Sequence, residues 1–221
     1  MYVGVYNGLY LLEKQSGEWR VLCKIDGFQD SCRLFEQESA KVLWIYNSGS
    51  ITRVELSEEL TRQISVKSYG VEEGFPVERQ IYVAKIEGRV YFTTPHGIYK
   101  YNVHKDMMEP CSDLNNLLNG AVPYTRLLEY HERLISLSPH EICIANLGTY
   151  KRGANTSINP IRQSFLELGQ DYEAIIPLSD SLMVIPNEEG FALFTVPEVR
   201  HRQDLTHSVY IRNMYLNEVL V

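Results

Sequence analysis

The chain has 221 residues, of which 44% are hydrophobic and 22% charged, the proportions of an ordinary globular protein rather than a disordered one. Its 21 Lys and Arg against 28 Asp and Glu give a net charge of −7. This charge argues against a nucleic-acid-binding protein, because affinity for phosphates depends on clustered basic residues. The sequence has no apolar run of the length that a transmembrane helix needs, and its first residues do not resemble a signal peptide.

A short apolar run, a turn and a second apolar run recur five times along the chain. The turns end at Gly8, Gly49, Gly97, Glu141 and Gly190, at intervals of 41, 48, 44 and 49 residues. Such a period is typical of β-propeller blades. Val, Ile, Tyr, Phe and Thr fill the runs, and Gly, Pro and Asn separate them, as in strands. The sequence therefore predicts an all-β protein, a β-propeller or partial propeller of about five four-stranded blades.

In chain order, the propeller region is expected to cover residues 1–205, with blade units at about 1–28, 29–70, 76–112, 122–169 and 171–198. The first unit begins at what should be its second strand. A capping Ser112 and a terminal Gly120 predict a short helix between the third and fourth units. Residues 151–160 are polar and are expected to form a loop insertion. Residues 206–221 read as a new strand that either closes the ring or opens a following β-sandwich domain, so the natural protein is expected to be longer.

The sequence lacks the common motifs of catalysis and cofactor binding. It has no Walker phosphate loop, no GxGxxG and no GxSxG. His131-Glu132 begins like a metalloprotease helix, but Ile135 stands where the second His is required. The four cysteines form no CxxC pair and are expected to be buried free thiols. We therefore predict no catalytic residues, no cofactor and no bound metal.

A propeller would gather two kinds of loop on one face: the loops that lead into each first strand and the turns between second and third strands. Ligands usually meet a rigid scaffold at such loops. Arg offers forked donors and Tyr a flat apolar face, which together suit carbohydrates and other polar ligands. The candidate ligand-binding residues on this face are Tyr46, Asn47, Glu78, Arg79, His96, Tyr124, Arg126, His140, Tyr172 and Glu188.

Several segments resemble the repeats of the regulator-propeller family of two-component systems. The resemblance is carried by Gly8-Leu9-Tyr10, by Leu43-Trp44-Ile45 and by the stretch from Phe92 to Tyr101. The segment from Tyr69 to Pro76 is similar to that family's linker between blades, and the stretch from Val209 to Asn217 is similar to the start of its triple-tyrosine domain. The resemblance covers most of the chain, although Trp44 is the one Trp at its repeat position and Glu141 replaces a Gly.

The resemblance implies a non-enzymatic sensor segment of a bacterial signal-transduction protein, periplasmic and responsive to glycan-derived ligands. A cytoplasmic location stays open, and membrane contact would come only through other parts of a longer chain. One alternative is a metal-assisted propeller enzyme, such as a glycan lyase or lactonase, for which His96 and His140 at equivalent turns are the candidates. The other is a plain protein-interaction scaffold. The expected partners are an oligosaccharide or other small ligand and a second copy in a homodimer, with no nucleic acid.

Overall fold

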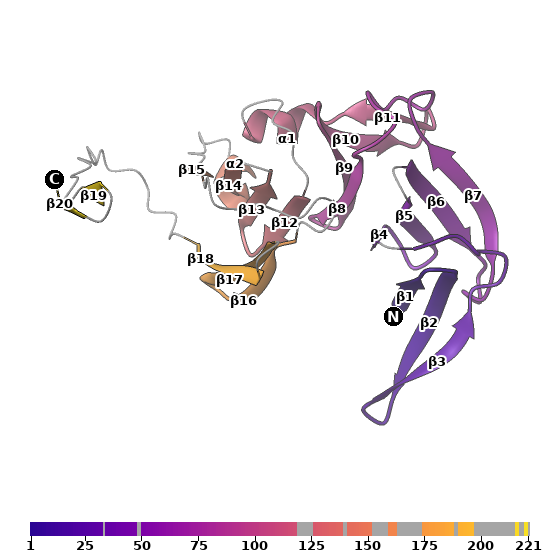
Figure 1. The fold of residues 1–221 in the computed structure, drawn as a ribbon. Helices are drawn as coiled ribbons and strands as arrows, with labels where there is room; N and C mark the ends of the chain where they lie inside the picture. Colours follow the sequence, from indigo (N-terminus) through magenta and orange to yellow (C-terminus); the bar gives the residue numbers. More distant parts are fainter. Residues whose placement is uncertain are drawn as a thin grey trace.

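A computed structural model describes residues 1–32, 34–47, 50–118, 126–138, 141–151, 159–162, 174–187, 190–196, 215–216 and 219–220. Among the described residues, five antiparallel sheets of three or four strands follow one another along the chain, and a sixth of two strands comes after them; each is formed by strands that are consecutive in sequence. Figure 1 shows the five larger sheets arranged in chain order along an arc, with β1–β3 at one end and β16–β18 at the other. The predicted all-β class is confirmed.

The first and second sheets are built from the first 69 residues. The first has three strands: β1 (Tyr2–Val5), β2 (Gly8–Gln15) and β3 (Glu18–Lys24). The second has four: β4 (Leu34–Gln37), β5 (Val42–Asn47), β6 (Ser50–Leu56) and β7 (Gln63–Tyr69). Residues 70–81 then connect to the third sheet, and Phe75 in this segment is buried between the two sheets.

The third and fourth sheets each have four strands. The third contains β8 (Tyr82–Ile86), β9 (Arg89–Thr94), β10 (Gly97–Asn102) and β11 (Met107–Pro110). The fourth contains β12 (Arg126–Tyr130), β13 (Arg133–Leu137), β14 (Glu141–Asn146) and β15 (Asn159–Arg162). The loop predicted for residues 151–160 is therefore partly wrong, because Asn159 and Pro160 pair with β14.

The chain ends with short elements. The fifth sheet contains β16 (Ile176–Ser179), β17 (Leu182–Asn187) and β18 (Gly190–Thr195). Strands β19 (Tyr215–Leu216) and β20 (Val219–Leu220) pair with each other. The rest of the predicted closing strand, and of segment 206–221, lies outside the described residues.

Two short helices connect the strands. The predicted helix is confirmed as α1 (Ser112–Leu117), but its N-cap is Cys111 and not the predicted Ser112. Leu114 and Leu117 are buried against the third and fourth sheets. A second helix, α2 (Leu147–Lys151), was not predicted, and it follows β14 directly. Among the described residues, no helix has the length and apolar character needed to span a membrane.

The same hairpin recurs in every sheet and fixes how the sheets pack. The strand after the hairpin turn begins at Gly8, Ser50, Gly97, Glu141 and Gly190, so the second unit is anchored at Ser50 rather than at the predicted Gly49. The next residue points towards the following sheet in the first four repeats, where Leu9, Ile51, Ile98 and Ile142 are buried. One apolar position per repeat thus helps to form each of the four interfaces between sheets.

The first strands of the middle sheets lie side by side. Strand β8 packs against both β4 and β12, and β4 and β12 belong to the sheets on either side. Lys85 on β8 also donates a hydrogen bond across to the Gln37 carbonyl on β4, at 2.6 Å. The sheets are therefore held together along their first strands as well as through the apolar clusters on their faces.

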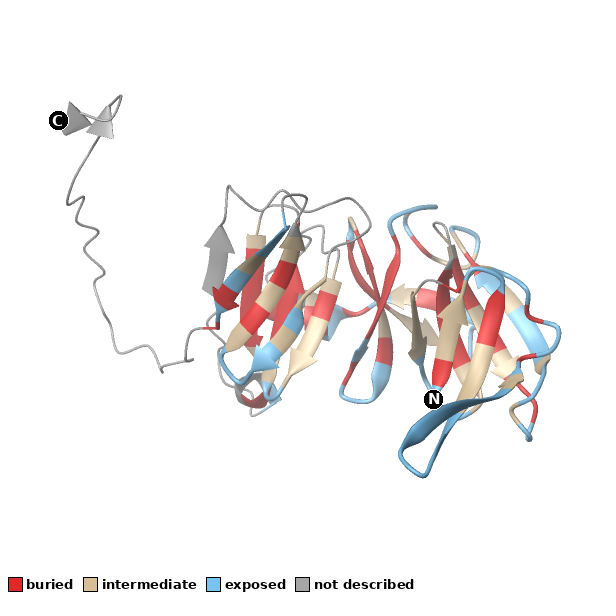
Figure 2. Cartoon of the chain, turned by 60° about the horizontal axis from the view of Figure 1, so that its bottom comes forward, coloured by how far each residue is buried: buried red, intermediate tan, exposed pale blue. Residues whose placement is uncertain are grey.

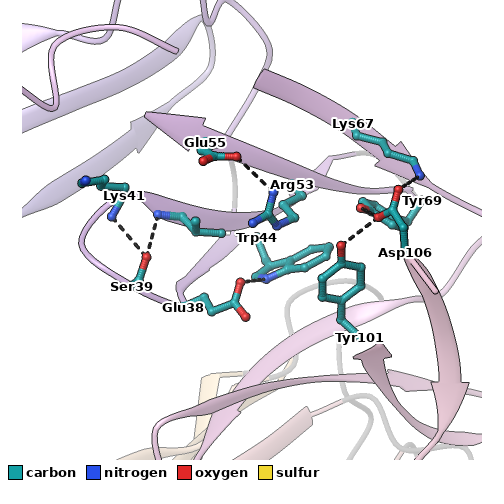
Figure 3. Close-up of polar contacts among 11 residues, drawn as sticks. Glu38, Ser39, Lys41, Trp44, Arg53, Glu55, Lys67, Tyr69, Tyr101 and Asp106 are labelled. Atoms are coloured by element: carbon teal, nitrogen blue, oxygen red, sulfur yellow. Dashed lines mark hydrogen bonds and ion pairs between the residues drawn. The ribbon is translucent and has the colours of Figure 1, made fainter. Parts of the chain in front are cut away.

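Trp44 is the centre of the interface between the second and third sheets. Its ring is fully buried and contacts Phe92 and Tyr101 edge-on, with ring centroids 5.0 Å away in both cases. Its indole N–H donates to the Glu38 carboxylate at 2.9 Å, so the one polar atom of the side chain is satisfied (Figure 3). Paired aromatic rings of this kind add to the gain from burial alone.

Asp106 joins the same two sheets near their outer strands (Figure 3). Its carboxylate accepts hydrogen bonds from Tyr69 at 2.6 Å and from Lys67 at 2.5 Å, both on β7, and from Tyr101 on β10 at 2.7 Å. The Lys67 ammonium and the two tyrosine hydroxyls hold the pKa of Asp106 well below its usual range. The ionised carboxylate therefore stabilises the contact between the second and third sheets.

Replacing each of the two tryptophans should show how much a buried ring stabilises the fold compared with an exposed one. We expect Trp44→Ala to lower the free energy of unfolding by about 3–5 kcal/mol, because it leaves a cavity between two sheets. Trp19→Ala, at a half-exposed position on β3, should change it by less than about 0.5 kcal/mol in dilute solution. Urea denaturation followed by circular dichroism measures both. Equal losses would mean that Trp44 does not occupy a packed interface.

The contribution of Asp106 should depend on pH. Because its pKa is lowered on folding, the stabilisation is complete above the unfolded value of about 3.9 and is lost as the pH falls through the folded value. Wild type should thus be more stable than Asp106→Asn at neutral pH, and the difference should shrink below about pH 4. Thermal melts across this range test it, with the exposed Asp30→Asn as the control. A difference that does not change with pH would contradict the contact.

Candidate functional site

One edge of the sheets carries most of the predicted ligand-binding residues that the structure describes. At this edge, which we call the turn edge, each first strand begins and each second strand turns into the third. Leu34 pairs with Tyr46 there, Tyr82 with Thr93, and Arg126 with Leu137. These three pairs are equivalent positions in the second, third and fourth sheets.

Three side chains from three different sheets meet at the turn edge. The rings of Tyr46 and Tyr82 lie 5.4 Å apart between centroids. The guanidinium carbon of Arg126 lies over the Tyr82 ring, 4.7 Å from its centroid. Because β8 packs between β4 and β12, Tyr82 is placed between its two neighbours. The sequence predicted Tyr46 and Arg126 for the same face, and the structure brings them together through Tyr82.

The two tyrosines support Arg126 rather than offer their rings to a ligand. Both Tyr46 and Tyr82 are buried, and both belong to the cluster between the second and third sheets. Arg126 is half-buried. A cation held over an aromatic ring in a partly desolvated place keeps a defined position. The turn edge thus carries a positively charged group in a defined place, which suits an anionic ligand group such as a carboxylate or a phosphate.

His96 lies exposed at the same edge, in the turn between β9 and β10. Thr94 braces this turn: its hydroxyl donates to the Gly97 carbonyl at 2.9 Å and accepts from the His96 N–H at 3.1 Å. Asn115 on α1 braces it from outside, accepting from the Ile98 N–H at 2.8 Å and donating to the Ile98 carbonyl at 3.0 Å. The imidazole is therefore carried by a rigid turn.

The other predicted residues are less well defined. Glu78 and Arg79 lie exposed in the connection before β8. Asn47 ends β5, and its side chain is not described. Tyr124, His140, Tyr172 and Glu188 lie outside the described residues.

Tyr82 was missed by the sequence analysis, which placed the third unit's contribution three to four residues earlier. The alternation of β8 and its pairing with Thr93 would have identified it, since Tyr82 is the counterpart of Arg126.

The structure also locates the groups that could serve metal binding or nucleophilic chemistry. Within the described ranges, no three His, Cys, Asp or Glu side chains gather closely enough to hold a metal ion. All four cysteines are free, and Cys32, Cys111 and Cys143 are buried as predicted, whereas Cys23 is only half-buried. Burial raises the pKa of the Cys32 and Cys143 thiols to about 12, so neither is a thiolate at neutral pH.

Comparisons with known proteins add little to these residues. No family model matches the chain, and no curated protein is significantly similar to it. Among solved structures, an extracellular domain assigned to the one-component system BT4673 of B. thetaiotaomicron aligns with 91% of this chain at 13% identity and a TM-score of 0.45. The chain spans 34% of that protein's length. A likeness at this level leaves fold and function to be argued from the residues themselves.

Two equivalent glycines test whether the His96 turn is braced as described. Gly97 and Gly190 begin the third strand of their sheets, and both have a positive φ, +119° and +145°. A Cβ at Gly97 would lie 2.8 Å from the Asn115 Oδ1, whereas a Cβ at Gly190 meets nothing within 4 Å. We expect Gly190→Ala to lower the free energy of unfolding by about 1–2 kcal/mol through backbone strain.

Gly97→Ala should lower the free energy of unfolding by about 1 kcal/mol more for each Asn115 hydrogen bond that it breaks. Chemical denaturation compares them, and equal costs would contradict the bracing by Asn115.

Proposed function

We propose that this chain is a ligand-binding series of β-propeller blades in a bacterial signal-transduction sensor, with no catalytic activity of its own. The observation that carries the proposal is the convergence of Tyr46, Tyr82 and Arg126 from three consecutive sheets at the turn edge. A ligand bound to Arg126 would rest on groups from all three sheets. Its binding would therefore favour one relative placement of those sheets over others, which is what a sensor requires.

The propeller arrangement is supported by the way the sheets follow one another. Each complete sheet is a four-stranded meander in sequence order, and neighbouring sheets pack face to face through an apolar cluster. The first strands β4, β8 and β12 lie together, as the innermost strands of propeller blades do. A propeller that gathers its loops on one face also accounts for the position of the turn edge.

The proposed ligand is an oligosaccharide that carries carboxylates, derived from the breakdown of a complex glycan. Arg126 would bind a carboxylate through paired hydrogen bonds, and the exposed His96 and Arg79 would add donors around it. The regulator-propeller resemblance supports this ligand class and a periplasmic location. The three buried thiols, and His96 as the one described histidine of the turn edge, favour binding over catalysis, because neither supplies an activated nucleophile.

Calorimetric titration with trigalacturonate, and with maltotriose as a neutral probe of the same length, tests the proposal. We expect wild type to bind trigalacturonate more tightly than maltotriose. Arg126→Gln should weaken trigalacturonate binding about ten- to hundredfold, the effect of losing hydrogen bonds to a charged group.

Arg89→Gln is the matched control, because Arg89 is an exposed arginine at the opposite end of the third sheet, where β9 begins. It should leave the affinity unchanged. Equal effects of the two variants, or wild type that binds neither sugar, would overturn the proposed site. Turnover of trigalacturonate into shorter products would instead support the alternative of a propeller enzyme.

A further inference from the structure

The outer face of the fifth sheet is apolar and exposed. We call this outer face the tail face, and it carries Ile176, Leu178, Phe191 and Leu193. Phe191 is 69% exposed and Leu193 60%. The inner face of the same sheet is buried against the fourth sheet through Met183 and its neighbours. Among the described residues, nothing comparable covers the tail face. An apolar patch of this kind on a folded protein usually marks an interaction site.

The repeat shows what this face is built to contact. Phe191 follows Gly190 at the start of β18, so it occupies the position of Leu9, Ile51, Ile98 and Ile142 in the earlier sheets. At that position the first three side chains have no exposed surface, and Ile142 has 1%. Each of them packs on the following sheet of the chain. The tail face therefore has the residues of an interface between sheets, although the short pair β19–β20 is the one described sheet that follows it in the chain.

The other end of the arc presents the complementary surface. We call the outer face of the first sheet the head face, and it carries Tyr10, Leu12, Trp19 and Val21. Leu12 occupies the position of Val54, Ala145 and Phe194, which are buried against the sheet before them. In Figure 2 the exposed hairpin of this sheet lies beside the N-terminus, away from the fifth sheet.

We propose that the tail face of one molecule binds the head face of a second copy of this chain. The same two kinds of face meet at all four interfaces within the chain, so the contact between copies repeats an established packing. Figures 1 and 2 both show the first and fifth sheets at opposite ends of the arc, so the two faces of one molecule do not meet. The head face in this contact therefore belongs to a second copy. This inference does not depend on the ligand proposed for the turn edge.

A head-to-tail contact has a consequence that a symmetric one lacks. Each molecule keeps one unused face after the contact forms, so association continues beyond the dimer unless the assembly closes into a ring. Wild type should therefore show a weight-average mass that rises with protein concentration. A symmetric contact of tail face with tail face would stop at two copies.

Two lysine substitutions in sedimentation velocity experiments test the proposal. Phe191→Lys blocks the tail face and Val21→Lys blocks the head face, and both side chains are more than half exposed in the single molecule. Each variant alone should associate at least about tenfold more weakly than wild type, as expected for a central interface residue. An equimolar mixture should form one-to-one dimers and nothing larger, because each molecule then keeps one working face. Ile64→Lys on β7 is the control, exposed but outside both faces, and should associate like wild type.

Other outcomes would overturn the proposal. A wild type that stays monomeric at every concentration would mean that the tail face is covered within one chain or not at all. Dimers of Val21→Lys alone would show a symmetric tail contact. Circular dichroism confirms that each variant is folded, and Leu193→Lys and Trp19→Lys repeat the experiment should either first variant fail to fold.

Discussion

The structure depends on one apolar position that recurs after each hairpin turn. Leu9, Ile51, Ile98 and Ile142 are each the second residue of the strand that follows this turn, and each is buried against the next sheet. A small antiparallel sheet with two apolar faces is not stable alone, because it cannot bury both. Stacking in chain order buries both faces of the second, third and fourth sheets and one face of the first and fifth sheets. The core is consequently a series of separate clusters, each shared by two neighbours.

The candidate site follows from the same stacking. Tyr46, Tyr82 and Arg126 belong to different sheets, and they meet only because β8 is packed between β4 and β12. The polar contacts of Asp106 hold the second and third sheets together at the far side of their interface. A shift between sheets would move Arg126 relative to its aromatic support, so the proposed binding would depend on the stability of the stack. The head face and the tail face carry the same repeated positions, and among the described residues no four-stranded sheet packs on either of them.

Much of the architecture could be predicted from the sequence because its signals are local. Apolar runs, turn residues and a repeat of blade length identified the sheets, and Ser112 with its following leucines identified α1. Ser50 was not identified as the second anchor because the neighbouring Gly49 is the stronger turn signal. Tyr82 was missed because its place is set by pairing with Thr93 and not by its own neighbours in sequence. The Lys67 contact with Asp106 joins residues 39 positions apart, which no local pattern reveals.

A double-mutant cycle between Tyr82 and Arg126 tests the central claim, that stacking of the third and fourth sheets brings the turn edge together. The free energy of unfolding would be measured for Tyr82→Leu, Arg126→Met, the double variant and wild type. The stacked arrangement predicts a coupling energy of about 0.5–2 kcal/mol, the range of a cation held over an aromatic ring. Strictly additive losses would contradict it, because two side chains that do not touch across the sheets cannot share an interaction energy.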